Sequence, residues 1–142
     1  MICLDVNLLI QATDPKATAH EKARIWFENQ MNSGQLVGIP WQTLCSFVRL
    51  STDGVSRRPA LSLNEALLFV EEWLEWETVW VPEPTKQHHV VYAGLLRQVE
   101  RPRLVMDAHL AAIAIEHRLI LCSADADFRM FAGLKLLNPL QP

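Results

Sequence analysis

The stretch 1-MICLDVNLLIQA-12 combines the two patterns that decide the fold of this chain. Met1–Leu4 is an apolar run with the length of a buried strand, and Asp5 stops it. Val6–Ala12 follows at once with the composition of a helix. A buried strand that leads directly into a helix is typical of α/β domains with a mainly parallel sheet.

The same alternation of apolar runs and helical patterns continues to the end of the chain. We therefore predict an α/β fold in which a central, mainly parallel sheet of four or five short strands is flanked by helices. Ser62 and Glu65 have the spacing of a capping box and predict that one of these helices starts at this point. Further strands are predicted over 36–39, 78–81, 119–122 and 134–137, and further helices over 18–32, 40–50, 62–76, 86–99, 107–117 and 127–131.

Length and composition exclude several classes of protein. The chain has 142 residues, a net charge of −3, 50% hydrophobic residues and 20% charged residues, so it is too apolar to be disordered. A chain of this length can bury about 68 to 70% of its unfolded surface, and we expect one domain over residues 1–142. With no long apolar run and no basic leader, we expect no membrane span, no signal peptide and a cytoplasmic location. The cysteines are expected to be buried and reduced: Cys3, Cys45 and Cys122.

Three aspartates, Asp5, Asp107 and Asp125, each lie where a strand or loop gives way to a predicted helix. Ligands of open parallel sheets bind at the carboxyl ends of the strands, where such residues gather. A single Asp in this position is more often an N-cap, and Asp107 is the strongest candidate for that role. Converging carboxylates repel each other unless a cation lies between them, and an all-oxygen donor set favours Mg²⁺ or Mn²⁺. This chemistry indicates metal-assisted hydrolysis of a phosphodiester bond by a metal-activated water.

The order and spacing of four motifs resemble the PIN-domain ribonucleases of the VapC toxin type. The motifs are 5-DVNLLI-10, 47-FVRLST-52, 107-DAHLAA-112 and 123-SADADF-128, and the likeness extends over essentially the whole chain. The resemblance implies a PIN fold and a Mg²⁺- or Mn²⁺-dependent endoribonuclease. It also implies a homodimer and the toxin of a type II toxin–antitoxin pair, inhibited by a VapB-type antitoxin.

The resemblance also assigns the site. Family members commonly carry a further acid on the helix after the second strand, where this chain has Ser46. The neutral hydroxyl predicts weaker metal binding, and Asn7 and Ser123 are polar neighbours that can orient the acids. The open alternative is a PIN-type module that binds RNA or a protein partner with little or no cleavage. The acidic metal site implied by the resemblance consists of three catalytic ligands, Asp5, Asp107 and Asp125, with Asp127 beside them.

Basic side chains near the acidic motifs are candidate RNA contacts. A net charge of −3 excludes binding by bulk charge alone, so we expect only a small basic rim. Arginine forms bidentate bonds with phosphate, and His109 follows Asp107 by two residues. The other histidines are expected to be solvated or hydrogen-bonded. The candidate RNA contacts are Arg49, Arg101, Arg103 and His109.

Four of the five tryptophans divide into two groups. Trp26 and Trp41 are expected to pack in the core. Trp73 and Trp76 lie on the predicted helix over 62–76 but are offset from its apolar stripe, and we predict that they belong to an antitoxin or dimer interface. The stripe that is expected to face the core consists of Leu63, Ala66, Leu67, Val70 and Leu74.

Overall fold

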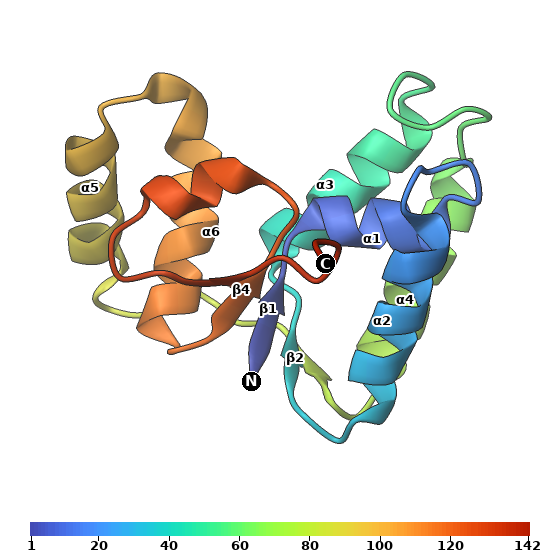
Figure 1. Ribbon diagram of the computed structural model, residues 1–142, viewed down its shortest axis with the longest axis horizontal. Coiled ribbons are helices and arrows are strands. Elements are labelled where there is room, and N and C mark those ends of the chain that lie inside the picture. Colours follow the sequence, from blue (N-terminus) through green and yellow to red (C-terminus); the bar gives the residue numbers. More distant parts are fainter.

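The computed structural model describes residues 1–142 and contains one sheet of five parallel strands in the order β3-β2-β1-β4-β5. Helices cover both faces of this sheet, α1 to α4 on one face and α5 and α6 on the other (Figure 1). The predicted α/β architecture is therefore confirmed. The elements in chain order are β1 (Ile2–Leu4), α1 (Val6–Thr13), α2 (His20–Asn32), β2 (Val37–Gly38), α3 (Trp41–Thr52), α4 (Leu63–Glu75), β3 (Val79–Trp80), α5 (His88–Val99), the 3₁₀ helix η1 (Pro102–Leu104), α6 (Val105–Glu116), β4 (Ile120–Cys122), the 3₁₀ helix η2 (Ala126–Met130) and β5 (Lys135–Leu137).

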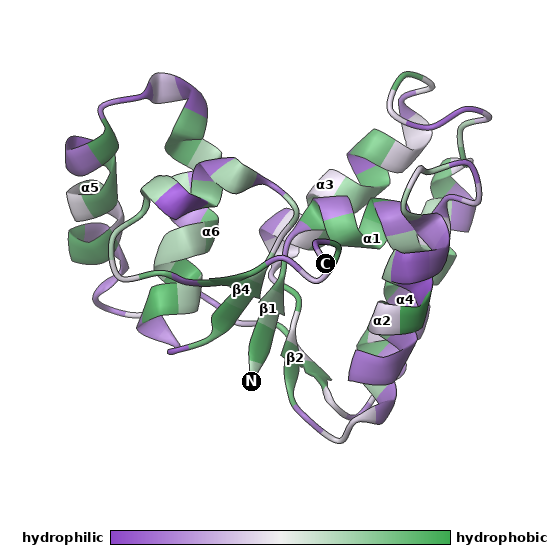
Figure 2. Cartoon of the chain, in the orientation of Figure 1, coloured by the Kyte–Doolittle hydropathy of each residue, from purple (hydrophilic) through white to green (hydrophobic).

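Strand β1 is central because it is apolar on both faces. Ile2 and Leu4 belong to the core cluster under α1 to α4, whereas Cys3 belongs to the cluster under α5 and α6. This is the alternation that a strand with two covered faces requires. Strands β1, β2 and β4 are mostly hydrophobic, and the outer face of α2 is hydrophilic (Figure 2). None of the helices combines the length and hydrophobicity that a membrane span needs.

Helix caps explain most of the observed boundaries. Ser62 and Glu65 form the predicted capping box, in which the Ser62 hydroxyl accepts a hydrogen bond from the Glu65 N–H at 3.1 Å. Asp5 caps α1 and Asp125 caps η2 through their side chains. The cap predicted for Asp107 is wrong: α6 starts at Val105, so Asp107 lies inside its first turn and does not cap the helix.

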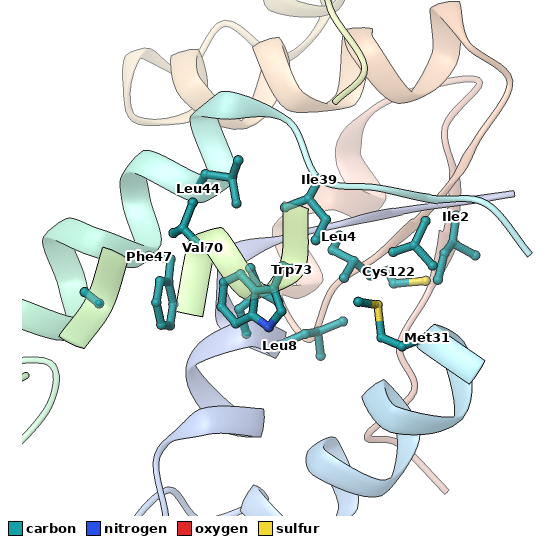
Figure 3. Close-up of a cluster of buried hydrophobic side chains, with 13 residues drawn as sticks. Ile2, Leu4, Leu8, Met31, Ile39, Leu44, Phe47, Val70, Trp73 and Cys122 are labelled. Atoms are coloured by element: carbon teal, nitrogen blue, oxygen red, sulfur yellow. The ribbon is translucent and has the colours of Figure 1, made fainter. Parts of the chain in front are cut away.

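Helix α4 presents a different face to the core from the one predicted. Trp73 is only 3% exposed and packs edge-on against Phe47 with the ring centroids 4.7 Å apart (Figure 3). The predicted role of Trp73 at an interface is therefore wrong. An indole buries more apolar surface than a leucine side chain, and turning it inward rotates the leucines outward. The exposed members of the predicted stripe are Leu63, Leu67 and Leu74, and the buried ones are Ala66 and Val70.

Helix α3 also exposes residues that were expected in the core. Trp41 is 53% exposed, and Cys45 is exposed as well, so both predictions of burial are wrong. The helix turns its other side, with Leu44 and Phe47, toward the sheet. Cys3 and Cys122 are buried free thiols, as predicted. The exposed apolar groups of α3 and α4 line a groove of about 500 Å³ that includes Trp41, Cys45, Val48, Leu63 and Leu67.

Candidate active site

The pairing of β1 with β4 brings the first acidic motif next to the last one. Leu4 is in register with Cys122, so the residues that follow them, Asp5 and Ser123, lie side by side at the carboxyl ends of the two strands. The Ser123 hydroxyl donates a hydrogen bond of 2.6 Å to Oδ2 of Asp5. Residues separated by more than a hundred positions thus meet because the two strands are parallel neighbours.

The Asp5 carboxylate is buried and firmly held. Its Oδ1 accepts a hydrogen bond from the Val6 N–H at 2.7 Å, and its Oδ2 accepts one from the Asn7 side-chain amide at 2.7 Å. Burial raises the pKa of Asp5, and the negative charge of Asp125 acts in the same direction, while the hydrogen bonds from Ser123 and Val6 oppose the shift. The carboxylate is therefore fixed in orientation next to another negative charge.

Asn7 and Ser123 connect the two motifs into one unit. The Asn7 side chain donates to the Ser123 hydroxyl at 3.0 Å and accepts from the Ala124 N–H at 3.1 Å. The Ser123 hydroxyl also accepts from the Asp125 N–H at 3.0 Å. Because the serine oxygen receives two hydrogen bonds and gives one to Asp5, it has little freedom, and the loop that carries Asp125 is tied to Asp5.

Asp107 lies in the first turn of α6, half-buried, with no hydrogen bond to its carboxylate. Its pKa is raised to about 6, first by burial and then by the charges of Asp5, Asp125 and Asp127. A carboxylate without a partner, surrounded by three others, is costly in the folded state. The three aspartates that the sequence singled out therefore lie close enough for their charges to interact, and Asp127 lies close by.

Asp127 and Arg103 form an ion pair at the edge of this cluster. The Arg103 guanidinium lowers the pKa of Asp127, and Arg101 contributes weakly in the same direction. Asp127 also donates its backbone N–H to Oδ1 of Asp125 at 2.9 Å. Asp127 therefore differs from the other three acids, because Arg103 already balances its charge. The same ion pair keeps one arginine beside the cluster.

The donor set fits a hard divalent cation, although the acids do not close around a metal position. No group of three or more His, Cys, Asp and Glu side chains is gathered tightly enough to hold an ion. Mg²⁺ keeps several waters and binds through one or two carboxylates plus substrate phosphate, so a closed cage is not required. The oxygen-only set Asp5, Asp107 and Asp125 has this character, and the repulsion that raises the pKa of Asp107 is what a cation offsets.

Helix α3 contributes to the site through residues that the sequence did not single out. Ser46 is half-buried and makes no hydrogen bond with the three central aspartates. Instead, the Thr43 hydroxyl donates to the Leu4 carbonyl at 2.9 Å, and the Gln42 amide donates to the Met106 carbonyl at 2.9 Å. Gln42 thus links α3 to the residue before Asp107. In the sequence, the signal for this role of Gln42 was its position in the first turn of the helix that follows Pro40.

The other predicted RNA contacts lie in different surroundings. Arg49 is exposed on α3 along the apolar groove, and no contact joins it to the acids. His109 faces α5, where its Nδ1 lies 2.8 Å from Nε2 of His88. His88 in turn pairs with Glu116 at 2.6 Å, a partnership across two helices that sequence spacing does not reveal. Burial and the neighbouring His88 lower the pKa of His109.

Comparison with known proteins identifies relatives along nearly the whole chain. The family model described as "PIN domain" matches residues 2–134. The chain is 35% identical to Ribonuclease VapC37 of Mycobacterium tuberculosis over 98% of this chain and 97% of that protein. Its fold is similar to that in the crystal structure of VapBC2 from Rickettsia felis bound to a promoter DNA fragment, with a TM-score of 0.70 and 18% identity over 97% of this chain and 98% of that one. It is also similar to the Sarcin-Ricin loop cleaving toxin VapC20 of Mycobacterium tuberculosis, with a TM-score of 0.68 and 17% identity over 95% and 99% of the two chains.

Proposed function

Because this chain belongs to the PIN domain family and is related along its whole length to VapC ribonucleases, we propose that it is a metal-dependent endoribonuclease that acts as the toxin of a type II toxin–antitoxin pair. The observation that carries the proposal is that Asp107, in the first turn of α6, has its pKa raised to about 6, first by burial and then by the charges of Asp5 and Asp125, which follow β1 and β4. Carboxylates with such unbalanced charge near the carboxyl ends of parallel strands are typical of a catalytic site.

We assign the binding of Mg²⁺ or Mn²⁺ to Asp5, Asp107 and Asp125. When bound, the cation supplies activation of the attacking water and positive charge opposite the phosphate. Ser123 and Asn7 hold the Asp5 carboxylate in place, and the same two side chains position the loop that carries Asp125. These side chains reduce the reorganisation that the acids undergo during the reaction.

Arg103 is the cation that the chain itself supplies at this site. It is exposed, so its guanidinium can reach a phosphate of the RNA, and Asp127 keeps it beside the acids between turnovers. Arginine binds phosphate oxygens in a bidentate manner, which suits this role. Arg101 is exposed on the same loop and adds positive charge, whereas Arg49 on α3 is the weakest of the three arginine assignments.

The protein partners that we propose are a VapB-type antitoxin and a second copy of the chain, in the cytoplasm. Solved structures of this fold that are described as VapBC complexes support an antitoxin partner. Trp76 is half-buried and lines a groove between α2 and α4, whereas Trp73 is buried. The proposed interface therefore includes Trp76 but not Trp73. The groove between α3 and α4, with Leu63 and Leu67 exposed, is a second apolar surface for protein contact.

The alternative function is an RNA- or protein-binding module without cleavage. It is favoured by one observation, that Ser46 supplies no acid from α3 and makes no hydrogen bond to the cluster. The remaining carboxylates are enough for a cation that keeps most of its waters. For this reason the nuclease is the better supported of the two functions.

The decisive experiment is cleavage of total cellular RNA by the purified, antitoxin-free protein. We expect cuts with Mg²⁺ or Mn²⁺, none with EDTA, and none with Asp107→Asn, which removes charge but little volume. Glu71→Gln is the matched control because Glu71 is exposed on α4, away from the acids. Absence of cleavage by folded wild-type protein would favour the binding module, and cleavage that survives in Asp107→Asn would refute the assigned site.

A further inference from the structure

A separate pocket lies beside the acidic cluster on the same edge of the sheet. We call it the proline pocket; it has a volume of about 240 Å³ and is lined by residues 40–42 after β2, residues 82–84 after β3, and His109 of α6. In the strand order β3-β2-β1-β4-β5, the carboxyl ends of β2 and β3 adjoin those of β1 and β4. Gln42 lines the pocket, and its side-chain amide donates to the carbonyl of Met106, the residue before Asp107, at 2.9 Å.

The pocket offers a flat aromatic surface. Trp41 is 53% exposed and forms one wall, with the rings of Pro40, Pro82 and Pro84 around it. An indole with half of its surface exposed is unusual, because tryptophan loses much of its hydrophobic stabilisation in water. Unpaired bases of RNA stack on such aromatic side chains.

The wall of the pocket is held rigidly. The Thr85 N–H and hydroxyl both donate to Oε1 of Glu116, at 2.9 and 2.6 Å, and this fixes the segment after β3 to α6. The carbonyl of Glu83 lies 2.7 Å from Nε2 of His117. With three prolines in addition, the two segments are ordered before any ligand binds, which lowers the entropy cost of binding.

The polar groups of the pocket are mainly hydrogen-bond acceptors. Nδ1 of His88 lies 2.6 Å from Oε2 of Glu116, and Nε2 of His88 lies 2.8 Å from Nδ1 of His109, so Nε2 of His109 is left without a partner. The Glu83 carboxylate has no ion pair or hydrogen bond, and Oε1 of Gln42 is buried without a partner. An incoming N–H donor would satisfy acceptors of this kind.

We propose that the proline pocket binds one unpaired base of the RNA, next to the phosphate that is cleaved, by stacking on Trp41 and by hydrogen bonds from the base to Glu83. A carboxylate accepts two hydrogen bonds side by side, so Glu83 favours guanine, whose ring N–H and exocyclic amino group donate together, over uracil, which donates through one N–H. The pocket thus determines sequence preference at one position. This inference rests on the proposed nuclease function, since the pocket is placed relative to its acidic site.

The test measures binding and cleavage separately. Binding of single-stranded oligouridine carrying one central adenosine, cytidine or guanosine is measured by fluorescence anisotropy on the Asp107→Asn background, which cannot cleave. We expect Trp41→Ala to weaken binding about tenfold or more, in line with base–aromatic stacking. Trp41→Phe should retain most of the affinity, and Ile25→Ala, a loss of comparable exposed apolar surface on α2, should change nothing.

Base selection is tested with Glu83→Gln. The wild-type pocket is expected to favour the guanosine-substituted RNA over pure oligouridine, and Glu83→Gln to reduce that preference several-fold, in binding and in kcat/KM. Equal affinity in Trp41→Ala and Trp41→Phe, or no preference for guanosine over uridine, would overturn the proposal. So would a Trp41→Ala protein that changes only its oligomeric state, because Trp41 would then belong to a protein interface.

The two proposals fail in different ways. If the wild-type protein cleaves RNA but binding is independent of Trp41, the pocket is refuted and the nuclease stands. If binding depends on Trp41 and on the base but no metal restores cleavage, the pocket stands and the nuclease is refuted.

Discussion

Helix α6 carries a carboxyl group near each end, and the pKa values of the two groups are shifted in opposite directions. Asp107 in the first turn has no hydrogen-bond partner and a pKa raised to about 6 by burial and by neighbouring acids. Glu116 in the last turn accepts hydrogen bonds from Thr85 and His88, and these lower its pKa despite burial. The helix dipole would have the reverse effect, since it favours negative charge at the N-terminus and disfavours it at the C-terminus.

The local surroundings of the two carboxylates therefore outweigh the helix dipole in determining their pKa values. Glu116 is a satisfied group that joins α5, α6 and the segment after β3. Asp107 is left without compensation, and a protein keeps such a group when it is used for binding or catalysis. The comparison predicts that substitutions at one end of α6 affect activity and those at the other end affect stability.

The largest expected effect is the difference in cleavage between Asp107→Asn and Glu116→Gln. Removing a metal-binding carboxylate should lower the cleavage rate by at least about 100-fold, since even indirect contacts to a metal are worth about 10- to 100-fold. Glu116→Gln should lower it by less than about tenfold, because Glu116 acts only through His88 and His109. Initial rates on one RNA at saturating Mg²⁺ measure both. Equal losses in the two variants would contradict the functional division of α6.

The next effect concerns stability. Glu116→Ala leaves the Thr85 N–H and the His88 ring without their partner in a mostly buried site. We expect the free energy of unfolding to fall by about 2 kcal/mol, the usual cost of buried groups that lose a charged partner. Urea denaturation at pH 7 measures this change, with exposed Glu71→Ala as the control. A loss no greater than that of the control would show that the cluster does not stabilise the fold.

Ser123→Ala tests how tightly Asp5 must be held. The substitution removes the 2.6 Å hydrogen bond to Asp5 and the acceptor of the Asp125 N–H. We expect cleavage to fall about tenfold and the Mg²⁺ concentration for half-maximal rate to rise, as for other contacts behind a metal ligand. Ser33→Ala, at an exposed hydroxyl that bonds only to the nearby backbone of Gln30 and Gln35, should have no effect on either quantity. A rate that depends on neither serine would mean that Asn7 and the Val6 N–H position Asp5 without Ser123.

The smallest effect is a change in the pH dependence of stability. The folded-state pKa of Asp107 lies at about 6, above its ordinary value of 3.8, so the folded protein holds the proton more tightly than the unfolded chain. The free energy of unfolding must therefore fall as pH rises through that interval. In EDTA at pH 7.5, the free energy of unfolding of Asp107→Asn should exceed that of the wild type by roughly 1 kcal/mol, a value reduced for solvent screening of a half-exposed group. Near pH 3.5 the two proteins should be equally stable. A variant without this gain would show that burial and the neighbouring acids do not destabilise the Asp107 carboxylate.

Much of the site could be predicted because its residues follow strands. Asp5 comes directly after an apolar run and Asp125 shortly after one, and parallel pairing of β1 with β4 brings such positions together in any fold of this type. The pairing of Asp127 with Arg103 and of His88 with Glu116 could not be predicted, because each joins elements whose separation along the sequence says nothing about their contact. These contacts decided which acids remain uncompensated.

The sequence by itself determined the alternation of strands and helices, the capping box of α4, and the central place of a strand that is apolar on both faces. Only the tertiary structure decided that Trp73 turns inward and Trp41 outward, and that Asp107 is no cap. Periodicity along one element defines its apolar face, but the neighbours that cover the face decide which side is buried. For α3 and α4 that choice followed from packing Phe47 against Trp73, a contact between two helices that neither helix encodes alone.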